Sequence, residues 1–144
     1  MSDQMARNFR ASEFACHDGT PWPADEQEAL KRVANTCQII RDAWGGPVTV
    51  VSAYRHPGYK SQHRKPKSQH AARGPLKHSP PCAVDLAPDD CTEGRSLAFY
   101  LTIRGLMDEG QIPKGGLGRY PGSFTHVDDR CFYGYLAAKW GPKA

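Results

Sequence analysis

One segment of the chain cannot join a regular helix or a central strand. Between residues 56 and 81 the sequence is interrupted by Pro57, Pro66, Pro75, Pro80 and Pro81. Each proline lacks a backbone N–H donor and fixes φ. A loop of this length in a compact domain is usually either functional or mobile. The regular elements must therefore lie on either side of it, and the total of 144 residues corresponds to one domain, residues 1–144.

Before this loop the sequence predicts one helix and one strand. In residues 25–44, apolar side chains recur at spacings of three and four, which defines one helical face: Leu30, Val33, Cys37, Ile40 and Trp44. Gly45 and Gly46 end this helix. The β-branched run PVTVVSAY, residues 47–54, predicts a strand. Residues 8–24 are predicted to be irregular.

After the loop, the sequence predicts three more strands and a second helix. The strands are residues 82–87, 115–120 and 123–128, the last two joined by the turn Tyr120-Pro121-Gly122. The helix covers residues 92–109, with Thr92 as a candidate cap and Leu97, Leu101 and Met107 as its core contacts. The aromatic tail, residues 132–140, is expected to dock on the body. The fold class is α+β, a small antiparallel sheet flanked by helices on one side.

Charge is unevenly distributed along the chain, whose formal net charge is +4. Between Asp42 and Asp85 there is no acidic residue, but there are seven basic ones: Arg55, Lys60, Arg64, Lys65, Lys67, Arg73 and Lys77. Such a segment favours an anionic polymer, either nucleic acid or the acidic bacterial envelope, although a purely solvated loop is the alternative. No recognition-helix pattern accompanies it, so we expect no specific nucleic-acid binding. A nucleic-acid binder would show steeply salt-dependent affinity for DNA.

Several other classes of protein are disfavoured. There is no apolar run near 18 residues, so we expect no membrane insertion. The first residues lack the pattern of a secretory signal, so we expect synthesis in a cytoplasm. The five cysteines form no C-x-x-C pair, which argues against a zinc ribbon and favours reduced thiols. We expect a monomer.

A group of His and Asp residues surrounds the end of the loop. His78 precedes Asp85 by seven residues, and His126 and Asp128 share one face of a predicted strand because they are two residues apart. If strands 82–87 and 124–128 are neighbours, His78, Asp85 and His126 can converge. Two imidazoles and one carboxylate leave an open fourth position on Zn²⁺, as in catalytic sites. By spacing alone, a surface histidine and a salt-bridged aspartate remain the alternative.

The order of motifs resembles the zinc DD-peptidases of the M15 family, which share their fold with the hedgehog signalling domain. The resemblance covers residues 9 to 140. It consists of an opening Glu13-Phe14-Ala15-Cys16, the block WGGPVTVVSAYR ending at Arg55, the His78 to Asp85 spacing, a final block and Trp140. The final block contains Gly115, Gly116, Gly118, Tyr120, Pro121, Phe124, His126, Val127, Asp128 and Arg130.

The resemblance implies a zinc peptidase that cleaves peptidoglycan stem or cross-link peptides, of the D-Ala-D-Ala carboxypeptidase or endopeptidase type. The zinc ligands it implies are His78, Asp85 and His126, and Arg55 would contact the substrate. Arg55 could instead form a structural ion pair. Asp128 is the candidate general base, and its alternative role is an acid paired with Arg130 behind the site. Without a signal peptide, the protein would reach the cell wall as a phage endolysin, a virion component or a secreted cargo.

The chain departs from the family pattern at three positions. Leu76 and Pro81 replace the usual Ser and Gly around His78, and Ser123 occupies a position that is acidic in many relatives. His70 is not a substitute for His78, since Lys77 stands where its partner carboxylate would be. These departures leave open a second interpretation, a non-catalytic module of the same fold with a structural or wall-binding role.

Overall fold

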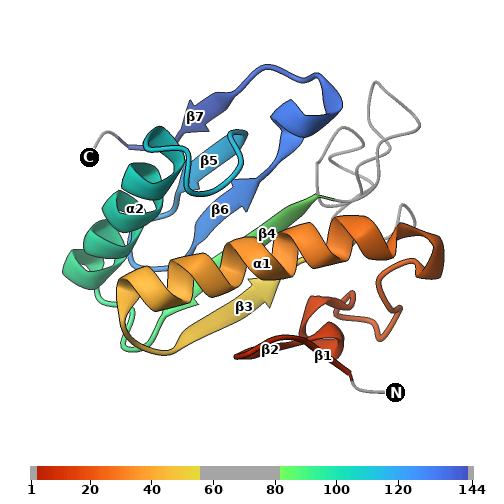
Figure 1. Ribbon diagram of the computed structural model, residues 1–144. Helices are drawn as coiled ribbons and strands as arrows, with labels where there is room; N and C mark the ends of the chain where they lie inside the picture. The colour runs from red at the N-terminus through yellow and green to blue at the C-terminus, as the bar shows by residue number, and fades with distance from the viewer. Residues whose placement is uncertain (1–2, 56–81, 143–144) are drawn as a thin grey trace.

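The computed structural model describes residues 3–55 and 82–142, and the proline-rich segment 56–81 therefore lies outside the described residues. Within these ranges, a five-stranded sheet has the order β3-β4-β6-β5-β7, and a two-stranded sheet pairs β1 with β2. The strands are β1 (Gln4–Ala6), β2 (Phe9–Arg10), β3 (Val48–Ser52), β4 (Ala83–Pro88), β5 (Gly116–Arg119), β6 (Thr125–Asp128) and β7 (Ala138–Trp140). Helices α1 (Gln27–Trp44) and α2 (Glu93–Asp108) both lie in front of the large sheet in Figure 1. The α+β class is confirmed.

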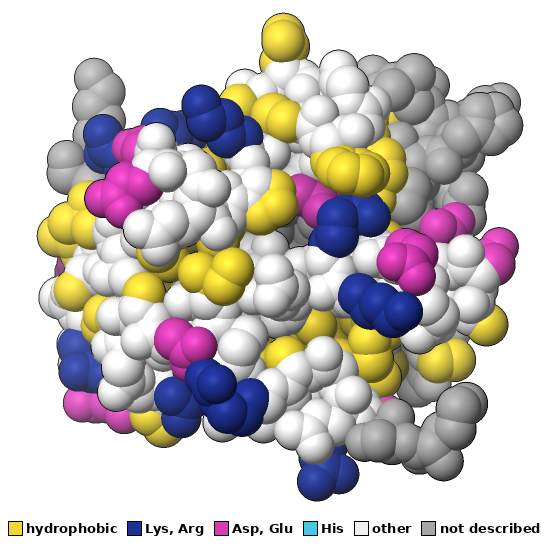
Figure 2. Space-filling model, in the orientation of Figure 1, with side chains coloured by type: hydrophobic (Ala, Val, Ile, Leu, Met, Phe, Trp, Pro, Cys, Tyr) yellow, Lys and Arg dark blue, Asp and Glu magenta, His cyan; other side chains and the backbone are white. Residues whose placement is uncertain are grey.

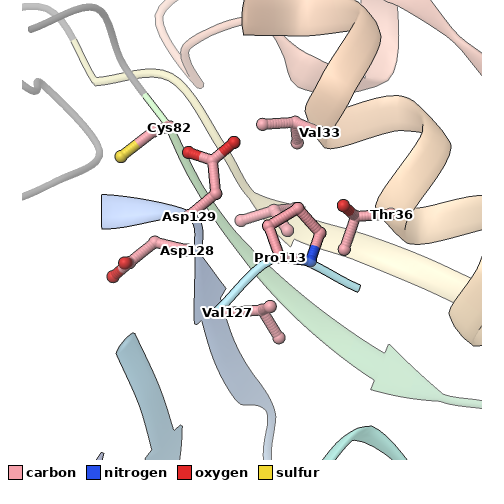
Figure 3. A pocket seen from close by; sticks show the side chains of 8 residues that line it. Val33, Thr36, Cys82, Pro113, Val127, Asp128 and Asp129 are labelled. Carbon is pink, nitrogen blue, oxygen red and sulfur yellow. The ribbon is translucent and has the colours of Figure 1, made fainter. Parts of the chain in front are cut away.

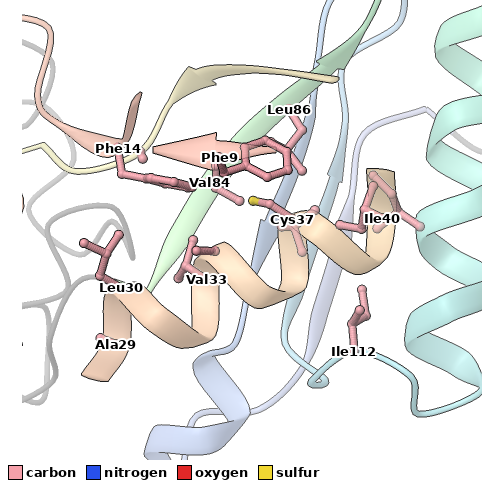
Figure 4. Packing of buried hydrophobic residues seen from close by; sticks show 14 of the residues in the cluster. Phe9, Phe14, Ala29, Leu30, Val33, Cys37, Ile40, Val84, Leu86 and Ile112 are labelled. Carbon is pink, nitrogen blue, oxygen red and sulfur yellow. The ribbon is translucent and has the colours of Figure 1, made fainter. Parts of the chain in front are cut away.

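The helix α1 forms the centre of the core. Leu30, Val33, Cys37 and Ile40 are each at most 4% exposed, and Figure 4 shows them directed at the strands. Trp44 packs against the edge of this cluster. Burying this apolar stripe stabilises the helix against the sheet by roughly 1.5–3 kcal/mol per large side chain. The helix ends at Gly45, whose φ of 78° is left-handed and suits glycine.

The helix α2 begins and packs partly as predicted. Thr92 Oγ1 accepts a hydrogen bond from Arg95 N at 3.3 Å, so the cap is confirmed. The predicted core role of Leu101 is wrong, because its side chain is 44% exposed. The buried stripe instead includes Phe99 and Ile103. Leu101 follows Phe99 by two residues, which places it about 200° around the helix.

The sheet differs from the prediction at its edge. Pairs β3–β4, β4–β6 and β6–β5 are antiparallel as expected. The docked tail adds β7, which runs parallel to β5, so the sheet is mixed rather than purely antiparallel. The chain reaches this parallel register because the short 3₁₀ turn Arg130–Tyr133 and the residues after it carry it back along the edge.

The N-terminal region is more regular than predicted. The β1–β2 pair precedes a short 3₁₀ turn at Ala11–Phe14, where an irregular segment was expected. Phe14 is fully buried, and its ring meets Trp22 edge-on at 6.5 Å. Trp22 in turn lies 6.2 Å from Tyr54, just after β3. These aromatic contacts attach the N-terminal region to the sheet.

The surface that carries the helices has mixed charge. Figure 2 shows Lys and Arg side chains interspersed with Asp and Glu on this face rather than gathered in one basic patch. The basic residues Lys60 to Lys77 belong to the segment outside the described residues. Among the described helices, none is long and apolar enough to span a bilayer.

Candidate metal centre

A single row of residues crosses all five strands of the large sheet. Asp85 on β4 is paired in register with Ser52 on one side and His126 on the other. His126 is paired with Gly118 on β5, which is paired with Trp140 on β7. Since alternate residues of a strand share a face, the row lies opposite the core residues Val84 and Val127 and therefore on the face away from the helices. Segments 82–87 and 124–128 are therefore neighbouring strands, which is the condition for Asp85 and His126 to converge.

The imidazole of His126 lies between two carboxylates. Its Nδ1 is 3.0 Å from Asp85 Oδ1, and its Nε2 is 2.7 Å from Asp128 Oδ2. The three residues are at most 7% exposed. Burial opposes the imidazolium, but the hydrogen bonds and negative charges of Asp128 and Asp85 outweigh it and raise the pKa of His126 above its ordinary value. The site therefore attracts positive charge.

Asp128 is surrounded by donors. Its Oδ1 accepts from Gly116 N at 2.8 Å, Arg130 N at 3.0 Å and Arg130 Nε at 2.9 Å. Its Oδ2 accepts from Arg130 Nη2 at 2.8 Å. Burial would raise the pKa of Asp128, but the hydrogen bonds and charges of His126 and Arg130 hold it far below the usual range. Asp128 is thus an ionised acceptor, and its pairing with Arg130, which the sequence left as an alternative, is present.

This pairing bears on the candidate role of Asp128 as general base. A base needs an accessible lone pair near the proton that it takes. The Asp128 side chain is fully buried, and both of its oxygens already accept hydrogen bonds. The geometry favours the other role, in which Asp128 orients the His126 ring.

Arg55 extends the charged chain on the other side. Its Nη2 donates to Asp85 Oδ2 at 3.0 Å and its Nε donates to Ser52 Oγ at 3.1 Å. The ion pair that the sequence left as an alternative is therefore present. Its side chain keeps 18% of its surface exposed, so the guanidinium is both paired and partly accessible. Positive and negative groups alternate from Arg55 through Asp85, His126 and Asp128 to Arg130.

The donor set of Asp85 and His126 fits zinc. Because ionised Asp128 can only accept, Nε2 is the ring nitrogen that carries the proton toward it. Because the pKa of His126 is raised, the metal-free ring also favours a proton on Nδ1, shared with Asp85 Oδ1 at 3.0 Å. A cation can take the place of that proton between the two ligand atoms. Ligand atoms about 2.0–2.1 Å from a tetrahedral zinc lie roughly 3.3 Å apart. The observed separation is close to this value.

The third predicted ligand, His78, lies outside the described residues, as does His70. Within residues 3–55 and 82–142, no group of three His, Cys, Asp or Glu side chains is arranged to hold a metal. The described part of the site thus supplies two ligand candidates, Asp85 and His126. Ser123 lies exposed in the turn before β6, and its carbonyl accepts from Cys91 Sγ at 2.7 Å.

Two glycines on the site face of β5 have no side chain and so leave room for neighbouring side chains. A Cβ on Gly116 would overlap Asp128 Oδ2 and lie 2.7 Å from Arg130 Nη2. A Cβ on Gly118 would overlap the Trp140 indole. The sequence pattern assigned no separate role to these two glycines. Their position could have indicated this role: two glycines spaced by two within a predicted strand lie on one face, and glycine in a strand often marks a place where another group approaches closely.

We expect Gly116→Ala to destabilise the protein by about 1–3 kcal/mol, the usual cost of overpacking, because Asp128 and Arg130 must move apart. Urea unfolding of the metal-free protein measures this. The control is Gly105→Ala in α2, where a Cβ meets nothing within 4 Å and should stabilise by about 0.5–1 kcal/mol. Equal stabilities of Gly116→Ala and the wild type would show that the Asp128 site tolerates the methyl group.

The helix side of this part of the sheet has a small pocket, with about 240 Å³ of space that includes open solvent. Its lining residues are Val33, Thr36, Cys82, Val84, Pro113, Val127, Asp128 and Asp129. Figure 3 shows that the Asp128 and Asp129 side chains leave the chain in different directions.

Two of the lining residues have contacts or chemistry of their own. Asp129 pairs with Arg32 on α1 at 3.1 Å, and burial raises the pKa of the Cys82 thiol. Cys82 lines this pocket together with Val84, whereas Asp85 is paired with His126 in the site row.

The chain was also compared with known proteins. No family model, no curated protein and no solved structure matches it.

Proposed function

We propose that this chain is a zinc-dependent peptidase that cleaves peptidoglycan stem or cross-link peptides, with a hedgehog/DD-peptidase-like fold. The observation that carries the proposal is the meeting of Asp85 and His126. They are 41 residues apart in sequence, yet Nδ1 and Oδ1 lie 3.0 Å apart. The motif resemblance names these two residues as zinc ligands, and their donor atoms have a spacing that suits zinc.

Each residue has a distinct part in this proposal. Asp85 Oδ1 and His126 Nδ1, with His78, would hold the metal. When bound, zinc would polarise the substrate carbonyl and make water a stronger acid. Asp128 keeps the proton on Nε2 and so directs the Nδ1 lone pair toward the metal position. Arg55 would use the exposed part of its guanidinium to orient a peptide carbonyl or carboxylate.

The second candidate function is a non-catalytic module of the same fold that binds the cell wall. Two observations favour it. Ser123 occupies the position that is acidic in many zinc DD-peptidases, and Asp128 is fully engaged with His126, Gly116 and Arg130. If no other acid reaches the site, zinc would have a structural role.

One experiment separates these functions. We expect the purified chain to bind one zinc and to release new amino termini from purified peptidoglycan, with cleavage lost in a chelator and restored by added Zn²⁺. Zinc content by mass spectrometry and products by liquid chromatography measure both properties. Zinc binding and sedimentation with sacculi without any cleavage would favour the wall-binding module. A chain that binds no zinc would contradict the proposed peptidase.

A further inference from the structure

The His126 ring has a third neighbour besides its two carboxylates. The indole of Trp140 lies 4.9 Å from the imidazole, centroid to centroid, with the planes at 48°. The contact is long-range within the sheet, because Trp140 is on β7 and His126 on β6, with β5 between them. A side chain on the intervening strand would normally separate the two rings.

Gly118 is the reason that they meet. It is paired in register with His126 on one side and Trp140 on the other. A Cβ at this position would overlap Trp140 Nε1 and lie 2.8 Å from Cζ2. The indole therefore lies across the backbone of Gly118 and reaches the imidazole.

The indole is itself fixed. Its Nε1–H donates to the Tyr120 hydroxyl at 2.9 Å, and the Tyr120 ring stacks on Phe124 at 4.4 Å. The Arg130 guanidinium lies 5.4 Å from the Trp140 ring centroid, within the range of a cation–π contact. A side chain with its hydrogen bond and its ring face both engaged keeps one rotamer, and it can hold a neighbour in place.

We propose that Trp140 is a positioning residue that holds the His126 imidazole in the plane joining Asp85 and Asp128, and that it thereby sets the zinc affinity of the site. The inference rests on the proposed function, because it takes His126 to be a zinc ligand. The ring torsion of histidine is broad, so two hydrogen bonds at its ends leave it free to rock out of plane. Packing against the indole removes that freedom and excludes water from one face, which strengthens the polar contacts inside.

The test compares zinc affinity in Trp140→Ala and Trp140→Phe with the wild type, by competition with a chromophoric chelator at one pH. We expect Trp140→Ala to weaken zinc binding about 10–100-fold, the range for loss of a group that orients a metal ligand. Trp140→Phe should recover most of this affinity, because an aromatic ring remains packed beside His126. If Trp140→Ala does not fold, Trp140→Leu fills the space without an aromatic face, and the same loss is expected.

Trp44 provides a matched control. It packs edge-on against Phe99 at 5.2 Å, on the helix side of the sheet and away from His126. Trp44→Ala should lower the free energy of unfolding without changing zinc affinity. If Trp44→Ala weakens zinc binding as much as Trp140→Ala does, the effect is one of general stability and the proposal is wrong.

A second readout requires no zinc. In the metal-free wild type, a hydrogen-bonded imidazole N–H of His126 should give a protected signal in proton–nitrogen NMR spectra. It should persist in Trp140→Phe and broaden or vanish in Trp140→Ala. A sharp signal in folded Trp140→Ala, or unchanged zinc affinity, overturns the positioning role. If the wild type binds no zinc, the proposed function fails, and this NMR comparison still decides whether Trp140 holds His126.

Discussion

His126→Gln is expected to remove zinc binding and peptidoglycan cleavage together. Glutamine fills similar space but lacks the imidazole Nδ1 that faces Asp85 at 3.0 Å. Loss of a ligand should cost more than the roughly 10–100-fold in affinity that follows from loss of an outer-shell partner. Zinc retained after gel filtration and the products of sacculus digestion are the measurements.

The control for this substitution is His17→Gln. His17 is exposed, and its Nε2 lies 2.7 Å from the backbone carbonyl of Val51 on β3. It should keep full zinc and activity, as should His70→Ala if His78 is the correct register. A His126→Gln protein that carries a full equivalent of zinc would remove His126 from the metal site.

Asp128→Asn is expected to have the largest effect on stability. The carboxylate is fully buried and accepts from His126, Gly116 and Arg130. An amide places donors against donors and leaves the Arg130 charge without its partner. Removing one member of a buried ion pair costs about 3–5 kcal/mol, which urea unfolding of the metal-free protein would measure. Zinc affinity should also fall about 10–100-fold, because Nε2 loses the acceptor that orients the ring.

Asp89→Asn is the matched control for Asp128→Asn. It removes the acid from a partly exposed pair with Arg95 and should change stability by less than about 1 kcal/mol. A different result would support Asp128 as the general base. In that case Asp128→Asn would keep its fold and its zinc but lose about 10²–10⁴-fold in turnover.

The sequence predicted the local elements well where a periodic pattern marked them. The stripe from Leu30 to Ile40, the Thr92 cap and the four strands around the loop are all present. These features depend on neighbours along the chain, so their signal is local. Leu101 shows the limit, since α2 is apolar on more than one face and periodicity alone did not select which face is buried.

In the described part of the candidate site, the sequence indicated candidate residues but not their contacts. Alternation along a strand placed His126 and Asp128 on one face, and the motif spacing singled out Asp85 and Arg55. Sequence spacing did not distinguish two roles for Asp128, a general base with an accessible lone pair and an ion-pair partner of Arg130. Both roles require the same residue on the same face of the strand. The hydrogen bonds from Gly116 and Arg130 distinguish them.

By itself, then, the sequence determined which side chains face which side of each strand, because that follows from a period of two. Only the tertiary structure decided which of them meet. The pairing of Asp85 with His126 depends on β4 lying beside β6 in one register, and a shift of one residue would turn His126 to the other face. The contact between Trp140 and His126 depends on the parallel docking of β7 and on the absence of a side chain at Gly118. Strand order and register are set by packing between distant segments, and no local pattern encodes them.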